Sequence, residues 1–456
     1  MFANKKVFYN LMVLLIVAAF LVGCGPQEAA EPTEEEAPPE EVATPIEAWA
    51  AEVHAQHEGT KLRVSAATHP SIEAFKAMTP RFEELTGIDV VWDEMEEGAH
   101  GQKMLLEATS GTTSYDVIMN CPERLPNLAD LGYLEPLDSW LKNTPDWFDN
   151  DDILLAYREM LAYEDVNYGV PFAGETVFLF YRKDLFDKYD VEVPTTFDEV
   201  METAEFFHGK EDGLSGVSFR CRSGWEFTYE WSIFIFPFGG LMVDPATGKP
   251  GLNNSGTVDS LEYMIELSQY APVGIESYSF PEAWDAFMQG KAAMMIEASA
   301  AAPEVENPDS SVVAGKVGYA PMPAGPAGAY SGVWGWGFSM TVGSENKDAA
   351  WAFITYMTGK ATHQEYIENG GIVSRASMLS DPKQQAQYSY YQAILETLKQ
   401  AADLQKQGLG VVLMIPEWSE ISEIMGTEGS RAFAGEITAQ EAADSMQAQV
   451  EEVFSR

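Results

Sequence analysis

The body of the chain alternates short apolar runs with amphipathic stretches. Residues 61–67 have the pattern of a strand, and residues 72–85 place apolar side chains at helical spacing. A strand-like segment at 88–92, a second helix through 104–106 and a third strand at 115–119 follow. Strand, helix, strand, helix, strand at this pace predicts a parallel sheet with helices on both faces.

Polar residues follow the first and third of these predicted strands. Thr68 and His69 come directly after the first, and Asn120 and Arg124 come after the third. In open α/β sheets, ligands bind beyond the carboxyl ends of the strands. We therefore expect these four residues near any ligand site in this half of the body.

The first 24 residues have the pattern of an export signal. Lys5 and Lys6 precede an apolar run at 7–22 that is short for a membrane span, and small residues follow it. The sequence Leu-Val-Gly-Cys at 21–24 resembles the bacterial lipobox, which implies that Cys24 is the lipid attachment site and that residues 1–24 are a lipoprotein signal peptide. An ordinary secretory signal and an uncleaved N-terminal span are the alternatives.

Residues 25–58 form a segment rich in Glu and Pro. It contains ten Glu, five Pro and no Lys, Arg or Asp. Such a segment repels itself and has little apolar surface to bury, so we expect a disordered tether. His54 and His57 lie in it without further ligands, and we interpret this pair as incidental rather than as a metal site.

The charge of the chain limits its partners. The formal net charge is −44; the signal carries +2 and the tether −10, so the body from Gly59 carries −36. A surface this acidic repels nucleic acid and anionic headgroups and favours neutral or cationic ligands. Solubility, or adaptation to high salt, explains the same charge. Cys121 and Cys221 are the remaining cysteines, and they predict either a disulfide or two free buried thiols.

Several short motifs occur along the body in a fixed order. Asp116-Val117-Ile118 and the segment 128–137 come first, and others follow at 170–172, 178–186, 194–199, 289–295, 320–326 and 346–354. In sequence and in order, these motifs resemble those of the extracellular solute-binding proteins of ABC importers, in the carbohydrate branch that includes maltose-binding protein. The similarity extends over essentially all of 61–456.

The resemblance implies an α/β, two-lobed periplasmic-binding-protein fold of type II. Each lobe is expected to be a mainly parallel sheet flanked by helices, with the ligand in the cleft between the lobes. We expect the N-terminal lobe to comprise 59–172 plus 324–372 and the C-terminal lobe 173–323 plus 373–456. The resemblance also implies a monomer outside the cytoplasm, anchored to the membrane by its N-terminal lipid, that delivers solute to permease subunits without a cofactor or a metal.

A sugar or polyol site needs aromatic platforms and polar groups that bind paired hydroxyls. Trp284 is expected to pack a helix, with lining of the cleft as the lesser alternative. The aromatic candidates are Trp225, Tyr229, Trp334 and Trp336, and the polar candidates are Glu175, Glu297, Ser299 and Arg375. Several of these candidates have an alternative role. Trp334 and Trp336 could be core residues, the two glutamates could be solvated surface residues, and Arg375 could form a structural salt bridge.

The sequence therefore predicts the substrate-binding component of an ABC transporter for a monosaccharide, oligosaccharide or polyol. A secreted glycoside hydrolase is an alternative, with Glu226 and Glu230, or Glu175 and Glu297, as its carboxylate pair. A binding protein for a non-sugar solute and an adhesive surface lipoprotein are two more. The chain has no nucleophile-elbow motif, phosphate loop or His-Glu-x-x-His motif, which leaves the enzyme with little support.

Overall fold

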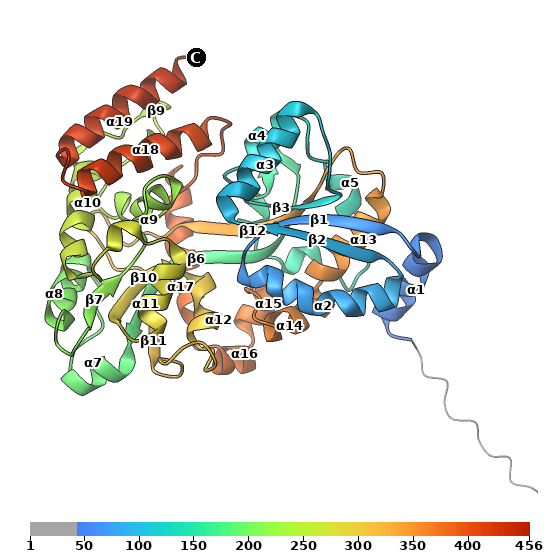
Figure 1. Cartoon of the computed structure of the whole chain (residues 1–456), viewed down its shortest axis with the longest axis horizontal. Helices are drawn as coiled ribbons and strands as arrows, with labels where there is room; N and C mark the ends of the chain where they lie inside the picture. The colour runs from blue at the N-terminus through green and yellow to red at the C-terminus, as the bar shows by residue number, and fades with distance from the viewer. Residues whose placement is uncertain (1–42) are drawn as a thin grey trace, which may run out of the picture. The chain divides into compact units, whose positions relative to one another are not determined.

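The computed structural model describes residues 43–456 (Figure 1). The predicted signal peptide, with Cys24, and the first part of the predicted tether, 25–42, lie outside the described residues. Within 43–456, no helix is long and apolar enough to cross a membrane.

The predicted alternation of strands and helices is confirmed. Gly87 ends α2 in the left-handed conformation, at φ 68°, which glycine adopts without strain. The strands are β1 Lys61–Ala67, β2 Asp89–Met95, β3 Val117–Asn120, β4 Ala162–Tyr163, β5 Val166–Asn167, β6 Val170–Arg182, β7 Ser215–Ser218, β8 Val243–Asp244, β9 Lys249–Pro250, β10 Ala292–Ala298, β11 Val317–Ala320 and β12 Val333–Met340.

Helices cover the strands on both faces. They are α1 Pro45–His57, α2 Pro70–Thr86, α3 Glu97–Ser110, α4 Leu125–Asp130, α5 Asp138–Leu141, α6 Leu155–Glu159, α7 Lys183–Tyr189, α8 Phe197–Phe207, α9 Trp225–Ile235, α10 Ser255–Leu267, α11 Phe280–Met288, α12 Ala302–Val305, α13 Lys347–Thr358, α14 Lys360–Glu368, α15 Ala376–Ser380, α16 Pro382–Gln387, α17 Tyr391–Gln405, α18 Trp418–Phe433 and α19 Ala439–Phe454. Short 3-10 turns lie at Asn150–Asp152, Ser268–Tyr270, Ile275–Ser277 and Ser299–Ala301.

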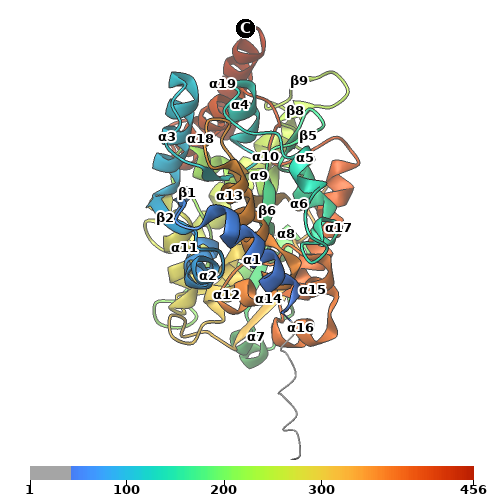
Figure 2. The same ribbon diagram turned by 90° about the vertical axis from the view of Figure 1, so that its right-hand side faces the viewer.

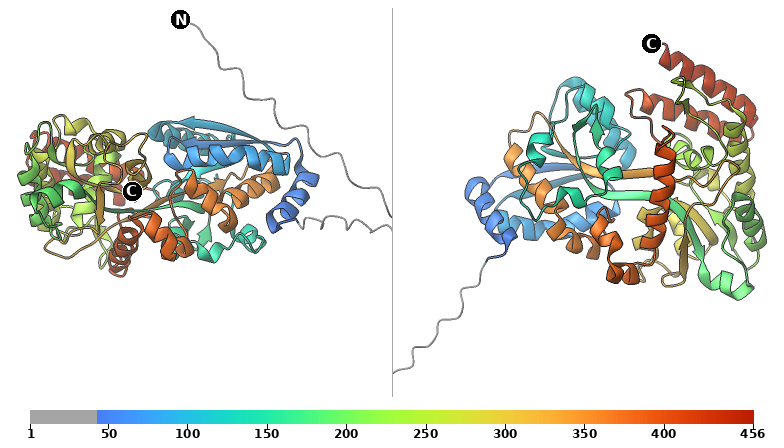
Figure 3. Two further views of the ribbon diagram at one scale, coloured as in Figure 1. Left: turned by 90° about the horizontal axis from the view of Figure 1, so that it is seen from below. Right: turned by 180° about the vertical axis from the view of Figure 1, so that it is seen from behind.

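Two long strands, β6 and β12, connect the lobes. The main sheet has the order β2-β1-β3-β12-β6-β10-β7, and β11 also pairs with β6. The first half of β6 pairs with β12, and its second half pairs with β10 and β11. Seen from behind, α17 lies across these strands at the junction of the lobes (Figure 3). The two-lobed α/β fold is thereby confirmed.

Parallel pairing is confined to the outer strands of each lobe. β1 pairs in parallel with β2 and β3, and β10 with β7. β12 and β6 run antiparallel to each other and to the other strands that they pair with. The sheets are therefore mixed rather than mainly parallel, because the chain crosses on β6 and returns on β12.

The lobe boundaries differ from those expected at two places. The segment that starts at Ala324 lies with the second lobe: the Ala324 N–H donates to Thr195 O at 2.8 Å, and the Phe197 N–H donates to Ala324 O at 3.0 Å. The return crossing is β12 itself, from Val333 onward. Residues 373–379 lie with the first lobe, since Arg375 donates to Phe148 O and Asp149 O.

The prediction of disorder for 25–58 is wrong for its last part, which is helix α1. Thr44 and Glu47 form a capping box at its start. Trp49 packs edge-on against Trp147 at a centroid distance of 5.2 Å and stacks on Tyr356. In side view, α1 lies over the end of the first lobe (Figure 2), where it contacts α2 and α13. The helical spacing of the apolar residues in this segment therefore indicates its structure better than its acidic composition does.

Cys121 and Cys221 are both buried and free. Burial raises the pKa of the Cys121 thiol to about 12, so the thiol is neutral and packs as a small apolar group. The structure therefore shows two free buried thiols rather than a disulfide.

Candidate functional site

A pocket lies between the lobes, beside the two crossing strands. The side chains leave a free volume of ≈ 30 Å³, which is room for about two water molecules. Aromatic rings make up most of the lining. The lining residues are His69, Glu97, Glu175, Arg220, Trp225, Tyr229, Phe280, Trp284, Ala300, Trp334 and Trp336.

Two tryptophans of β12 form one wall. Trp334 and Trp336 alternate with glycines, so both rings point to the pocket side of the strand. A Cβ atom on Gly335, which faces the other way, would lie 2.4 Å from Ala173 O on β6. Tyr229 of α9 meets Trp334 edge-on at 5.9 Å. Glycine thus keeps β12 close to β6 while the indoles face the pocket.

Glu175 of β6 lies opposite Trp334 in the strand register and is 5 % exposed. His69 caps α2: its Nδ1 accepts from the Ser71 N–H at 3.2 Å. A neutral His69 therefore carries its proton on Nε2, which donates to Glu175 Oε1 at 3.3 Å. This leaves Glu175 Oε2 available to accept a hydrogen bond from a ligand.

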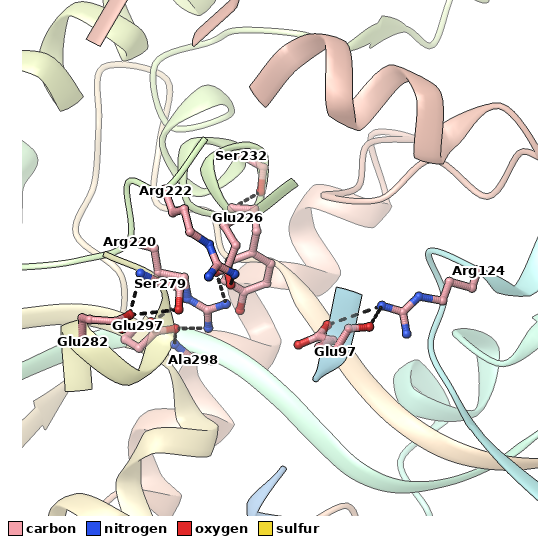
Figure 4. A network of polar contacts seen from close by, with 11 residues as sticks. Glu97, Arg124, Arg220, Arg222, Glu226, Ser232, Ser279, Glu282, Glu297 and Ala298 are labelled. Carbon is pink, nitrogen blue, oxygen red and sulfur yellow. Dashed lines mark hydrogen bonds and ion pairs between the residues drawn. The ribbon is translucent and has the colours of Figure 1, made fainter. Parts of the chain in front are cut away.

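Arg220 anchors the second lobe's side of the pocket. Its Nε and Nη2 donate to the two oxygens of Glu297 at 2.7 and 2.6 Å, and Nη1 donates to Glu226 Oε2 at 3.4 Å. Arg222 donates to the other oxygen of Glu226 at 2.9 Å (Figure 4). Burial alone would lower the pKa of Arg220, but Glu297 and Glu226 outweigh it and raise that pKa. The group is a fully paired buried cation.

Glu230 lies next to this network on α9. It is fully buried, and neither carboxyl oxygen has a hydrogen-bond partner among the described residues. Burial, followed by the charge of Glu297, raises its pKa well above the usual range of a carboxyl group. We therefore treat Glu230 as protonated.

Glu97 and Arg124 approach from the first lobe (Figure 4). Arg124 Nη2 lies 3.7 Å from Glu97 Oε1 and donates to the Glu97 carbonyl at 3.2 Å. The guanidinium also lies over the Trp336 ring, 5.7 Å from its centroid. Burial raises the pKa of Glu97 to about 8 even though Arg124 opposes this shift. Glu97 is therefore protonated over much of the neutral range.

The structure brings half of the predicted site residues to the pocket lining and the others elsewhere. His69, Glu175, Trp225, Tyr229, Trp334 and Trp336 line it. Arg124 lies behind Trp336, and Glu297 behind Arg220. Three others have local roles: Ser299 Oγ accepts from the Thr176 N–H, Asn120 bonds to Ser339 and to the Cys121 N–H, and the exposed Thr68 donates to Met95 O.

The assignment of Arg375 to the ligand site is wrong. Its side chain is 0 % exposed and donates to the carbonyls of Phe148, Asp149 and Thr358. Asp152 lies 3.6 Å from its Nη1. Arg375 instead joins the backbone at 148–149 and at Thr358 to its own segment in the first lobe, because its N–H groups hydrogen-bond to these carbonyls.

Four lining residues were not predicted from the sequence, and Trp284 was predicted to pack a helix. Glu97 follows β2 by two residues and Arg220 follows β7 by two residues, so the rule that selected His69 after β1 would also have selected them. Ala300 also follows a strand, β10, by two residues, whereas Phe280 has no comparable signal in the sequence. Within the described residues, no cluster of His, Cys, Asp and Glu could hold a metal ion.

Comparisons with known proteins agree with this architecture. The chain is 26% identical over 330 residues to the erythritol/L-threitol-binding protein of Mycolicibacterium smegmatis, which covers 68% of the chain and 69% of the relative. It is 26% identical over 421 residues to a Sinorhizobium fredii protein named "Probable amino-acid ABC transporter periplasmic-binding protein", covering 89% and 92%.

Among solved structures, an ABC transporter solute-binding protein from Agrobacterium radiobacter K84 in complex with ribitol superimposes with a TM-score of 0.81. The two share 28% identity over 87% of this chain and 100% of that one. The family model described as "Bacterial extracellular solute-binding protein" matches residues 66–364. The chain thus belongs to the bacterial extracellular solute-binding protein family.

Proposed function

We propose that this protein is the substrate-binding component of an ABC transporter and that its solute is a small sugar or polyol. The observation that carries the proposal is the set of polar groups in the aromatic pocket. Tyr229 Oη and Trp284 Nε1 have no partner among the described residues, and Glu175 Oε2 is available as an acceptor. Hydroxyl groups both donate and accept, so a polyhydroxy solute matches this set.

The pocket also fits such a solute in the kind of surface that it offers. Indole and phenol rings provide platforms for the C–H faces of a sugar or polyol. The free volume of ≈ 30 Å³ holds about two water molecules, so the lobes have to separate before any sugar or polyol can enter. A relative named for tetritols and a similar structure bound to ribitol favour a short polyol or a single sugar unit.

In the proposed mechanism, the lobes close on the solute and the closed form is recognised by membrane permease subunits. The crossing strands β6 and β12 are the hinge, and Glu175 and Trp334 lie on it beside the solute. The protein acts as a monomer outside the cytoplasm. Cys24 carries the lipid that anchors it to the membrane, and residues up to α1 form the tether.

A glycoside hydrolase is disfavoured by how the candidate carboxylates are paired. Both oxygens of Glu297 accept from Arg220, and Glu226 accepts from Arg220 and Arg222. Glu230 does not line the pocket. Neither pair therefore offers the two available carboxyl groups that glycoside hydrolysis needs.

The test is a binding screen of the mature chain by thermal shift and calorimetry against tetritols, pentitols, hexitols, monosaccharides and amino acids. Binding to the folded state raises the melting temperature by mass action. We expect a hit among the polyols or monosaccharides, with no product on long incubation, and loss of that hit in Trp334→Ala. Binding of amino acids alone would assign the protein to another solute class, and sugar cleavage would support the hydrolase.

A further inference from the structure

We infer that the pocket selects uncharged polyhydroxy solutes and rejects their carboxylate counterparts, because the one guanidinium group in its lining is already neutralised. This inference rests on the proposed function and narrows its ligand class. Among residues 43–456, the basic side chains that line the pocket are Arg220 and His69. Each is paired with a buried carboxylate of the protein itself.

The charge of Arg220 is already compensated by two carboxylates of the protein, which take three of its five N–H groups. Two of its nitrogens form the bidentate pair with Glu297, and the third donates to Glu226. Arg220 is 6 % exposed and Glu297 0 %. A ligand carboxylate on the remaining N–H groups would lie beside Glu297 and Glu226 and would meet a guanidinium whose charge they already neutralise. To gain the full cation it would have to displace Glu297, and breaking a buried pair in this way is strongly unfavourable.

His69 offers no cation either. Because its Nδ1 accepts from the Ser71 N–H, its remaining proton lies on Nε2 and is directed at Glu175. In this state the ring is neutral. Arg124 lies behind Trp336 and outside the lining, where its guanidinium contacts the Glu97 carbonyl. An anion in the pocket would therefore contact carboxyl groups without an available cation.

The charged groups around the pocket already balance. Three carboxyl groups, those of Glu175, Glu226 and Glu297, face three guanidinium groups, those of Arg124, Arg220 and Arg222, while the raised pKa values of Glu97 and Glu230 keep those two carboxyl groups neutral. A further negative charge in this desolvated space would therefore have no countercharge. A hydroxyl group, in contrast, can accept from Tyr229 or Trp284 and donate to Glu175. The pocket thus discriminates at the level of a single functional group.

The experiment compares each polyol with the aldonic acid of the same carbon skeleton: erythritol with erythronate, ribitol with ribonate, and sorbitol with gluconate. Dissociation constants are measured by calorimetry on the mature chain near neutral pH and at fixed ionic strength. For whichever polyol binds, we expect its acid to bind at least about 100-fold more weakly. Binding of the acid within about tenfold of the polyol would overturn the inference and leave the proposed function intact.

A variant tests whether Arg220 sets this preference. In Glu297→Gln the side chain keeps its shape but no longer neutralises Arg220, so we expect the polyol-to-acid preference to fall at least about tenfold. The control is Glu205→Gln, which removes the same charge from the exposed face of α8 in the same lobe. Equal effects of the two variants would overturn the assignment to Arg220 in favour of overall acidity. If Glu297→Gln fails to fold, the wild-type ligand pairs still decide the question.

Failure of the proposed function has a different signature. If neither polyols nor monosaccharides bind to the wild-type chain, the proposed function fails and the inference with it. If a polyol binds and its acid binds equally well, only the inference fails. If an acid binds and its polyol does not, the solute class is anionic and both statements are wrong.

Discussion

At the scale of single residues, Gly101 determines where Arg124 lies. A Cβ atom on Gly101 would be 2.6 Å from Arg124 Nε, so Gly101→Ala should push the guanidinium off Trp336 and Glu97. Alanine also favours a helix over glycine by about 0.5–1 kcal/mol. We expect the dissociation constant for the solute to rise about fivefold, while the melting temperature stays level or rises.

The matched control for this substitution is Gly98→Ala on the same helix. There the new Cβ would meet only the exposed Glu96 carboxylate, at 3.1 Å. The control should change stability in the same direction and leave affinity unchanged, as measured by calorimetry and thermal melting. A parallel loss of affinity in both variants would show that α3 as a whole, rather than the place of Arg124, controls binding.

Glu97 should make solute binding depend on pH. Its pKa is raised to about 8 by burial, against the effect of Arg124, with Glu226, Glu123 and Arg220 acting at longer range. In an open, hydrated cleft the pKa would return toward about 4.3, so closure between these two values takes up a proton. Affinity is then highest at low pH, falls as pH rises toward 8 and levels off above it.

We expect the dissociation constant to increase about tenfold or more between about pH 6 and pH 8. Calorimetry in buffers of different ionisation enthalpy should detect the proton taken up. Glu97→Gln should abolish both effects, whereas Glu84→Gln, which changes an exposed position on α2, should preserve them. A flat profile in the wild type would mean that Glu97 does not change its hydration when the solute binds.

At the scale of elements, α1 is a structural part of the first lobe. Trp49→Ala removes an indole that packs between Trp147 and Tyr356, and we expect a loss of about 2 kcal/mol of unfolding free energy. Solute affinity should not change, because α1 does not line the pocket. Glu52→Ala, on the exposed face of α1, is the control. Denaturant unfolding measures both, and equal stability of Trp49→Ala and wild type would show that α1 contributes little.

The elements also show what the sequence can and cannot predict. The run from β1 to β3 was predictable because the spacing of its apolar residues alternates between the strand period of two and the helix period of 3.6 residues. His69 was predictable because ligands bind beyond the carboxyl ends of the strands in such sheets. The helix α1 was missed because ten Glu in 25–58 obscured the apolar spacing of its face. The role of Arg375 was not predictable, because the carbonyls of Phe148 and Asp149 that engage it are more than 200 residues away.

At the scale of the whole described body, the two lobes also meet away from the pocket. Asn127 Nδ2 of α4, in the first lobe, donates to Pro416 O at 2.7 Å; Pro416 precedes α18, whose Trp418 is in the second lobe's core. A hydrogen bond that exists only while the lobes are closed stabilises the closed form, and therefore the complex, by about 1 kcal/mol. Asn127→Ala should weaken solute binding about fivefold, although Asn127 does not line the pocket.

Asn143→Ala is the matched control, because Asn143 Nδ2 bonds to Ser139 O within the first lobe. It should leave affinity unchanged. Small-angle scattering adds a readout that a purely local defect would not alter: at a solute concentration that closes the wild-type protein, Asn127→Ala should retain a larger radius of gyration, and excess solute should remove the difference. If affinity is lost with no change in scattering, the bond does not control closure, and the effect of Asn127 lies within α4.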